Sequence, residues 1–233
     1  MVIYGLFAMI KKLKKKGLFI EKFKEFPVTY TLIILNLLVF IFTILDVSWS
    51  NFIFQFSAIQ GYAVVTRGEI YRLLTSMFVH NDLIHISMNM LSIYMVGRMV
   101  ERLFSKMAYI SLYFISGFFG SFTYMAVSFS DGAVGASGAI FGVFGALAGF
   151  AFVHRRTMQH QFIQFMKDFG IILVINFFIG IIFPSIAMSA HIGGLIAGIL
   201  GGVVMAKSKN YLGIYLIISL LLLFGVYSYL PFY

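Results

Sequence analysis

The sequence of 233 residues contains no cysteine. This absence excludes disulfide bonds, thiolate nucleophiles and cysteine-ligated zinc or iron–sulfur sites. Charged residues are also scarce, at 11% of the chain, whereas 61% of the residues are hydrophobic. Such a composition is typical of a protein that spans a lipid bilayer, not of a soluble domain. Any site chemistry must therefore come from serine, histidine, acidic, lysine or tyrosine side chains or from the backbone.

Seven segments are apolar over all or nearly all of the roughly 20 residues that a helix needs to cross a bilayer. We expect these helices at residues 28–47, 82–100, 107–128, 136–153, 168–184, 188–206 and 211–230. The sequence thus predicts an all-α, polytopic membrane helix bundle. The first ten residues are too few to span, and the basic run KKLKKK follows them, whereas a secretory signal carries its charge before the apolar stretch.

The net charge of +9 comes from short basic runs between the apolar segments. This pattern argues against a nucleic-acid-binding face and for membrane orientation. With the N-terminus in the cytoplasm, every lysine and arginine except Arg67 and Arg72 lies on the cytoplasmic side. Those two fall in the connection 48–80, which we expect to be an amphipathic, aromatic-rich loop at the outer leaflet. We therefore expect a multi-pass protein of the plasma membrane, in contact with the lipid bilayer and without a nucleic-acid partner.

Polar side chains inside a bilayer are costly, so they are candidates for function. In this topology three spans run inward from the outer face, and each carries polar residues near its outer end. His85 and Asn89 lie four residues apart on one face of the second span. Ser137 lies in the first turn of the fourth span, and His191 lies about one turn into the sixth. The four side chains are thus expected at a similar depth.

The glycines give a reason for the fourth and sixth spans to approach each other. Small residues four apart form a groove that admits a second helix, and such pairs occur at Gly138 and Gly142 and at Gly194 and Gly198. If the grooves face each other, Ser137 Oγ and His191 come within hydrogen-bond distance, an arrangement that activates a serine nucleophile. Neither span carries an acidic residue at this depth, so we predict a dyad without a carboxylate.

The same region could stabilise an oxyanion. Backbone N–H groups at the start of the helix that contains Ser137 have no partner within the helix. The amide of Asn89 and the imidazole of His85 could add side-chain donors. Together these groups would suit acyl transfer.

Other interpretations stay open at this point. A serine in a glycine-rich apolar helix can be a packing residue, and His191 can be a hydrogen-bonded interior histidine. His80, His85 and His191 could instead bind a metal ion, although no intramembrane carboxylate or cysteine accompanies them. A channel or transporter with histidine as a proton relay is a further class. We expect no metal and no cofactor, and we expect Glu69 and Glu101 to act in ion pairs or at helix ends.

Several of these stretches match one family. GASG at 135–138 and AHIGGLIAG at 190–198 resemble the GxSG and AHxxGxxxG motifs of the rhomboid intramembrane serine proteases. EIYRLLTSMFVHNDLIHISMNM at 69–90 is similar to the family's first-loop aromatic–arginine pair followed by HxxxxHxxxN. GRMVER at 97–102 is similar to the end of the family's second core helix. The resemblance covers roughly residues 28–206.

The resemblance implies roles for individual residues. Ser137 would be the nucleophile and His191 the general base and acid, while His85, Asn89 and the Ser137 amide would form the oxyanion site. Phe141 stands where some rhomboids carry a tyrosine that stacks on the catalytic histidine. Supporting positions would be Gly135, Gly138, Phe141, Gly194, Gly198 and His80. The first-loop pair reads Tyr71-Arg72 where Trp-Arg is the usual form.

The resemblance also implies an organisation and an activity. We expect a basic cytoplasmic arm at 1–26, a six-span catalytic core at 27–206 and an additional C-terminal helix at 207–233, a six-plus-one arrangement. The implied activity is that of a serine endopeptidase that cleaves single-span membrane proteins near the outer face of the membrane. The alternative is a catalytically silent rhomboid-like protein that binds membrane clients. The span at 168–184 is a candidate lateral gate, and FPSIAMS at 183–189 a candidate cap.

Overall fold

The computed structural model describes residues 18–158 and 187–229, together with residues 160, 163–164, 167–168 and 170–171. Helices dominate this part of the chain, and its only β-type pairing is an isolated antiparallel bridge between Ile59 and Ala133. The all-α class is therefore confirmed. The predicted span 168–184 and residues 1–17 of the predicted arm fall largely or wholly outside the described residues.

The helix bounds follow the predicted spans closely. The helices are α2 (Leu18–Glu25), α3 (Pro27–Leu45), α4 (Val47–Ser57), α5 (Gly61–Thr66), α6 (Arg72–Thr75), η1 (Ser76–Phe78), α7 (Leu83–Ser92), η2 (Ile93–Gly97), α8 (Arg98–Leu103), α9 (Lys106–Val127), α10 (Ser137–Val153), α12 (Met188–Lys207), η3 (Lys209–Tyr211) and α13 (Leu212–Tyr229). Within the described residues, five helical segments are long and apolar enough to cross a membrane, namely α3, the continuous run α7–η2–α8, α9, α12 and α13. The shorter apolar helix α10 lies among them. The protein is thus a multi-pass membrane helix bundle.

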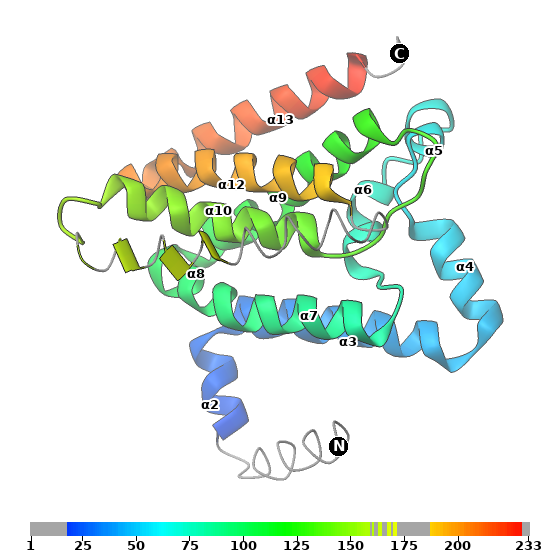
Figure 1. Cartoon of the computed structure of the whole chain (residues 1–233), viewed down its shortest axis with the longest axis horizontal. Coiled ribbons are helices and arrows are strands. Elements are labelled where there is room, and N and C mark those ends of the chain that lie inside the picture. The colour runs from blue at the N-terminus through cyan, green and yellow to red at the C-terminus, as the bar shows by residue number, and fades with distance from the viewer. Residues whose placement is uncertain are drawn as a thin grey trace.

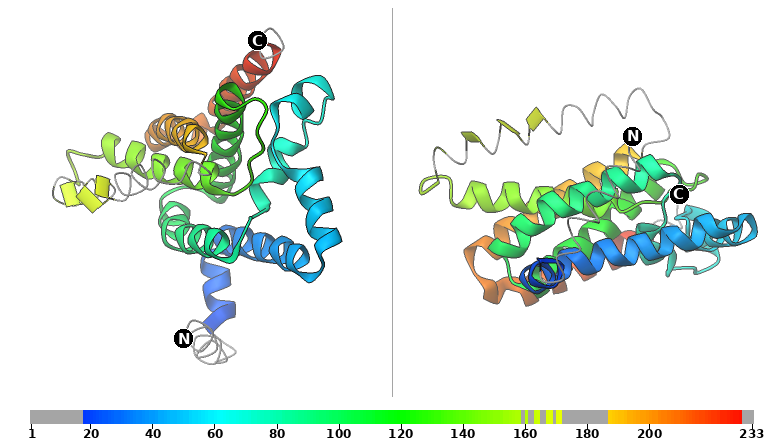
Figure 2. Two further views of the ribbon diagram at one scale, coloured as in Figure 1. Left: turned by 45° about the vertical axis from the view of Figure 1, so that its right-hand side comes forward. Right: turned by 90° about the horizontal axis from the view of Figure 1, so that it is seen from below.

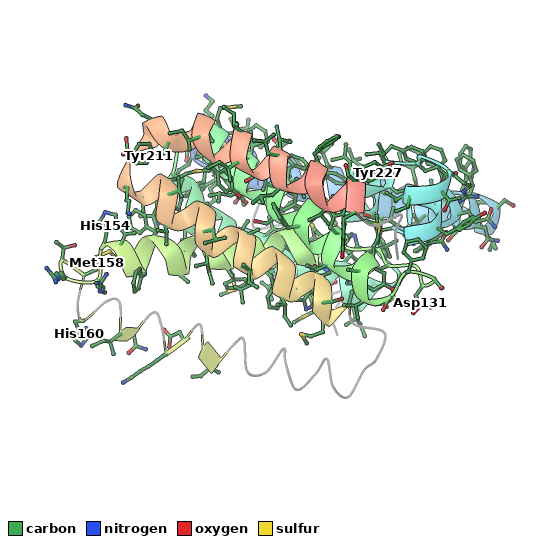
Figure 3. The ribbon with its side chains drawn as sticks, turned by 90° about the horizontal axis from the view of Figure 1, so that it is seen from above. Asp131, His154, Met158, His160, Tyr211 and Tyr227 are labelled. Atoms are coloured by element: carbon green, nitrogen blue, oxygen red, sulfur yellow. The ribbon has the colours of Figure 1, made fainter. Side chains whose placement is uncertain are left out.

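The arrangement of these helices brings three N-termini to one end of the bundle. In Figure 1, α7, α10 and α12 all begin at the end where α4, α5 and α6 lie. Two views in Figure 2 show α3 beside α7, while α9, α10 and α12 pack against one another. Figure 3 places Asp131 at this end and His154 and Tyr211 at the opposite end. The predicted polar residues near the starts of α7, α10 and α12 therefore share one end of the molecule.

The opposite end is held together by Glu101, at the end of the second span. Its carboxylate accepts hydrogen bonds from the backbone amides of Val28 and Thr29, at 2.8 and 2.9 Å, and from Thr29 Oγ1 at 2.7 Å. These amides belong to the first turn of α3, where N–H groups lack partners within the helix and favour a negative charge. Glu101 thus has the helix-end role that was expected of it.

The connection between the first two spans is helical and anchored from within. Arg72 is buried and donates a hydrogen bond to Ala58 O at 2.8 Å. It also forms an ion pair with Glu69 and donates a hydrogen bond to that carboxylate, and the latter bond lowers the pKa of Glu69. Tyr71 stacks on Phe56 with ring centroids 4.6 Å apart. The Tyr71-Arg72 pair therefore serves loop packing, with tyrosine providing the aromatic surface.

Candidate active site

Ser137 is the first residue of α10 and is reached through a sharp turn at Gly135. Gly135 has φ +127°, a conformation that residues with a side chain rarely adopt, and its N–H donates to Ser76 O at 2.8 Å. A methyl group on Gly135 would also lie 2.7 Å from Nε2 of His85. Glycine at this position thus allows both the turn and the close approach of the His85 ring.

The glycine grooves of α10 and α12 face each other. A methyl group on Gly194 would run into the carbonyl oxygen of Gly138, and one on Gly198 into the carbonyl oxygen of Gly142. The series continues one turn further, where Gly202 faces Ala146. Because both helices run in the same direction and contact at every turn, their backbones lie close together along most of their length.

This packing brings His191 to Ser137. Nε2 of His191 lies 2.8 Å from Ser137 Oγ, while Ser137 itself stays partly exposed and His191 is buried. The ring of Phe141, one turn after Ser137, lies parallel to the imidazole, with centroids 4.2 Å apart and an interplanar angle of 6°. Nδ1 of His191 is buried without a hydrogen-bond partner in the described part of the chain. The described residues thus provide no carboxylate to orient the ring.

His85 and Asn89 project from α7 as their spacing predicts. The ring of His85 lies against Gly135, close to Ser137, and is near enough to His191 for an electrostatic interaction. Asn89 is buried and donates through Nδ2 to the carbonyl oxygen of His85 at 2.9 Å. An amide carries two N–H groups, so this bond engages only one of them.

His80 lies just before α7 and packs edge-on against His85, with ring centroids 4.9 Å apart. Its side chain is buried, and this burial lowers the pKa of His80 to about 4, with a smaller contribution from the nearby His85. His80 is therefore neutral at ordinary pH and supports the His85 ring as a packing partner.

A small cavity opens beside Ser137. Its volume of about 30 Å³ is enough for a group the size of a water molecule. About half of the lining residues are glycines and alanines from α9, α10, α12 and the segments that precede α10 and α12. Larger side chains, among them Ile59, Met77 and Tyr124, line the rest. The space next to the serine is thus narrow and lined partly by small residues.

Metal binding receives no support from the geometry. Among residues 18–158, 187–229 and the few described positions between them, no three histidine, aspartate or glutamate side chains gather as a metal site would require. His80 and His85 contact each other through their rings, and His191 contacts Ser137. The three histidines considered as ligands are thus engaged in different contacts.

The site also includes α9, which the sequence analysis did not assign to it. Gly120 of α9 lies against the carbonyl oxygen of Ala190, and Thr123 Oγ1 lies 2.9 Å from the carbonyl oxygen of Ser189. The signal was present as small residues at 116, 117, 120 and 121, spaced for close helix contact. Of the candidate cap 183–189, residues 188 and 189 already belong to α12, and 183–186 lie outside the described residues.

Comparison with known proteins gives the chain its family. The model of the Rhomboid domain matches residues 67–208. Rhomboid protease GluP of Bacillus subtilis is 30% identical over 189 residues, covering 78% of this chain and 36% of that protein. RHOMBOID-like protein 4 of Arabidopsis thaliana is 33% identical over 148 residues, covering 64% of this chain and 37% of that protein.

A further relative carries a different description. Inactive RHOMBOID-like protein 8 of Arabidopsis thaliana is 32% identical over 135 residues, covering 58% of this chain and 38% of that protein. The chain spans between about a third and a half of the length of the first relatives it matches. Since the domain match covers more than half of the chain, and the helical membrane fold agrees with it, the chain belongs to the rhomboid family.

Proposed function

We propose that this protein is a serine endopeptidase that hydrolyses peptide bonds of membrane-spanning substrates through Ser137 and His191. The observation that carries the proposal is the 2.8 Å separation of His191 Nε2 and Ser137 Oγ, with the imidazole held flat against Phe141. A nucleophile and a base within hydrogen-bond distance are the minimum requirement for covalent acyl transfer. Family membership supports the same activity.

The reaction follows from this pair. The hydroxyl of Ser137 donates to Nε2 of His191, so the neutral ring carries its proton on Nδ1. As Oγ attacks the carbonyl carbon of the substrate, Nε2 takes the hydroxyl proton, and a tetrahedral intermediate forms. The imidazolium then gives this proton to the leaving amine, and the acyl-serine remains. Water, activated by the same imidazole, releases the acid and restores Ser137.

The oxyanion of the intermediate would meet donors from two helices. The N–H groups at the start of α10 point toward the end of the bundle where the carbonyl must lie, and the helix dipole favours negative charge there. The imidazole of His85 and the second amide N–H of Asn89 would supply the side-chain donors. The position of His85 against Gly135, beside Ser137, supports this assignment.

The substrate must be unwound before it can react. Within a membrane, a helix satisfies all of its backbone hydrogen bonds internally, so a scissile peptide becomes accessible only where the helix opens. Substrates with glycine, proline or other weak helix formers near the cut are therefore expected to be favoured. The cavity beside Ser137, with a volume of about 30 Å³, would admit a small group and not a bulky side chain.

The first experiment is labelling of the detergent-purified protein with a fluorophosphonate probe. Labelling that disappears in Ser137→Ala and falls sharply in His191→Ala would support the proposal. Ser111→Ala serves as the control, because Ser111 is also a buried serine of the bundle but belongs to α9 and lies outside the cavity. Equal labelling of the native protein and Ser137→Ala would refute it. A folded native chain without labelling would favour the silent client-binding alternative, which the inactive relative makes worth testing.

We propose further that the N-terminus is cytoplasmic, that the site opens to the outer face of the plasma membrane, and that residues 27–206 form the catalytic core with 207–233 as an added span. The distribution of basic residues supports the orientation.

Since the chain has no cysteine, single introduced cysteines can show directly on which side of the membrane a position lies. In whole cells, a membrane-impermeant maleimide should label Gly132→Cys but not Thr157→Cys, both exposed positions. The reverse pattern would overturn the orientation.

A further inference from the structure

The first turn of α12 carries His191, yet it has no side-chain cap of its own. The N-cap residue is Ala187, whose side chain has no hydrogen-bonding group, and α12 begins at Met188. The backbone carbonyl of Ala187 accepts from the amide of His191 at 3.2 Å. The imidazole of His191 has no second hydrogen-bonding partner among the described residues, since its Nδ1 is unpaired there. The position of the imidazole therefore depends on the Phe141 ring and on where the backbone of this turn is held.

A single hydroxyl of α9 links the two helices at this turn. Thr123 Oγ1 lies 2.9 Å from the carbonyl oxygens of Phe119 and Gly120 in its own helix, and 2.9 Å from that of Ser189 in α12. A hydroxyl carries one proton, so Thr123 donates to one of these three carbonyl oxygens at a time. The first two are the usual local acceptors of a threonine within its own helix. The third crosses between helices and ends two residues before His191.

The shape of α12 allows this link. Thr123 occupies the space that a side chain at Gly193 would need, since a methyl group on Gly193 would run into both Oγ1 and Cγ2 of Thr123. Next to it, a methyl group on Gly120 would lie 2.8 Å from Ala190 O. The carbonyls of residues 189 and 190 thus rest in a notch formed by Gly120 and Thr123. Gly193 is not part of the AHxxGxxxG pattern, whose glycines here are Gly194 and Gly198.

We propose that Thr123 is a positioning residue that holds the first turn of α12 through Ser189 O, and so sets the place of His191 relative to Ser137. The proposal rests on the proposed function of the Ser137–His191 pair. In a dyad without an orienting carboxylate, anchoring of the histidine backbone takes over part of the task that a third side chain performs elsewhere. Small displacements of reacting groups are expensive, with about a hundredfold loss of rate for 1 Å.

The test uses isosteric variants and the rate of inactivation by the fluorophosphonate. Thr123→Val keeps the shape and removes the hydroxyl, and we expect the maximal inactivation rate to fall between about tenfold and a hundredfold, with little change in the probe concentration for half-maximal rate. Thr123→Ser restores the hydroxyl and should recover most of the rate. Thr43→Val is the matched control, because Thr43 is buried and donates only to Phe40 O of its own helix.

Three outcomes would overturn the proposal. For the inactivation rate, these are a native rate in Thr123→Val, equal losses in Thr123→Val and Thr123→Ser, and equal losses in Thr123→Val and Thr43→Val, which would indicate general loosening of the packing.

A second measurement, independent of catalysis, keeps the proposal separate from the proposed function. The side-chain ¹⁵N resonances of His191, assigned with His191→Ala, should shift in Thr123→Val and not in Thr43→Val. Unchanged resonances would refute the positioning role, whereas a folded native chain that is never labelled would refute only the catalytic one.

Discussion

The ring of Phe141 lies parallel to the imidazole of His191, with centroids 4.2 Å apart and only 6° between their planes. The two residues come from α10 and α12, the same two helices that carry Ser137 and the facing glycine grooves. The aromatic ring thus limits rotation of the imidazole about its side-chain bonds while leaving Nε2 directed at Ser137. A stacked ring is a non-polar substitute for an orienting hydrogen bond.

Replacement of Phe141 should separate stacking from simple bulk. Phe141→Leu removes the flat surface, and because an aromatic stacking contact contributes about 0.5 to 1.5 kcal/mol, we expect a loss in labelling rate of up to about tenfold. Phe141→Tyr keeps the ring and should label at nearly the native rate. A Leu variant as fast as the native protein would show that the stack does not orient His191.

The contact between Gly198 and Gly142 predicts a large packing effect. Gly198→Val would place a branched side chain against the backbone of α10, and overpacking of this kind costs about 1 to 3 kcal/mol or more. We expect a clear drop in thermal stability in detergent and loss of labelling. Gly225→Val on α13 is the control, since a side chain there meets nothing within 4 Å. Equal stability of the two variants would contradict the packing described for α10 and α12.

The carboxylate of Glu101 predicts a stability effect far from the serine. Glu101→Gln keeps the shape but replaces one acceptor oxygen and the negative charge at the start of α3, so a loss of about 1 to 2 kcal/mol is expected. Glu25→Gln, in the exposed pair with Arg102, should change stability little. Denaturation in mixed micelles measures both. The fluorophosphonate rate should be unchanged in each, and a large loss of rate in Glu101→Gln would argue that the two ends of the bundle are coupled.

The low pKa of His80 predicts how stability depends on pH. A proton binds the folded protein at this site with a pKa of about 4, below the ordinary value near 6.5. The unfolded chain thus binds the proton more readily, so stability is full above pH 6.5 and falls as the pH decreases toward 4. Once the pH is below 4, the free energy of unfolding has decreased by about 3 kcal/mol through this group. Unfolding measured from pH 7 to pH 4 should show this decline, and His80→Asn should make it shallower. Identical slopes in the two proteins would exclude His80 as its source.

The features that depend on one helix at a time could be predicted from the sequence. The span bounds follow from apolar length: α10 begins at Ser137 and α12 at Met188, where starts at 136 and 188 were expected. The contact between Gly138 and Gly194 could be anticipated, because small residues at a spacing of four let two helix backbones approach closely in a membrane. Chain order and direction then placed Ser137 and His191 at a common depth.

Features that depend on three helices at once were not accessible in this way. The bond from Thr123 to Ser189 O requires the rotation of α9 about its axis, and a threonine in an apolar helix is usually satisfied by its own backbone. The π-helical turn at 93–97 is equally invisible in composition, since it inserts no unusual residue. The helices α4 and α5 lie in a connection whose aromatic character predicted an interfacial position but not a fold.

The seam between α10 and α12 has a mechanical consequence. Its contacts are backbone against backbone at every turn, through Gly138, Gly142 and Ala146 on one side and Gly194, Gly198 and Gly202 on the other. If α12 shifted along α10 by one residue, a side chain would run into a carbonyl group of the other helix. The two helices can therefore neither slide along nor rotate against each other without separating. The two helices are thus expected to move together as one rigid unit. A motion that admits a substrate is therefore expected to occur around this helix pair, without a change in the register of the two helices.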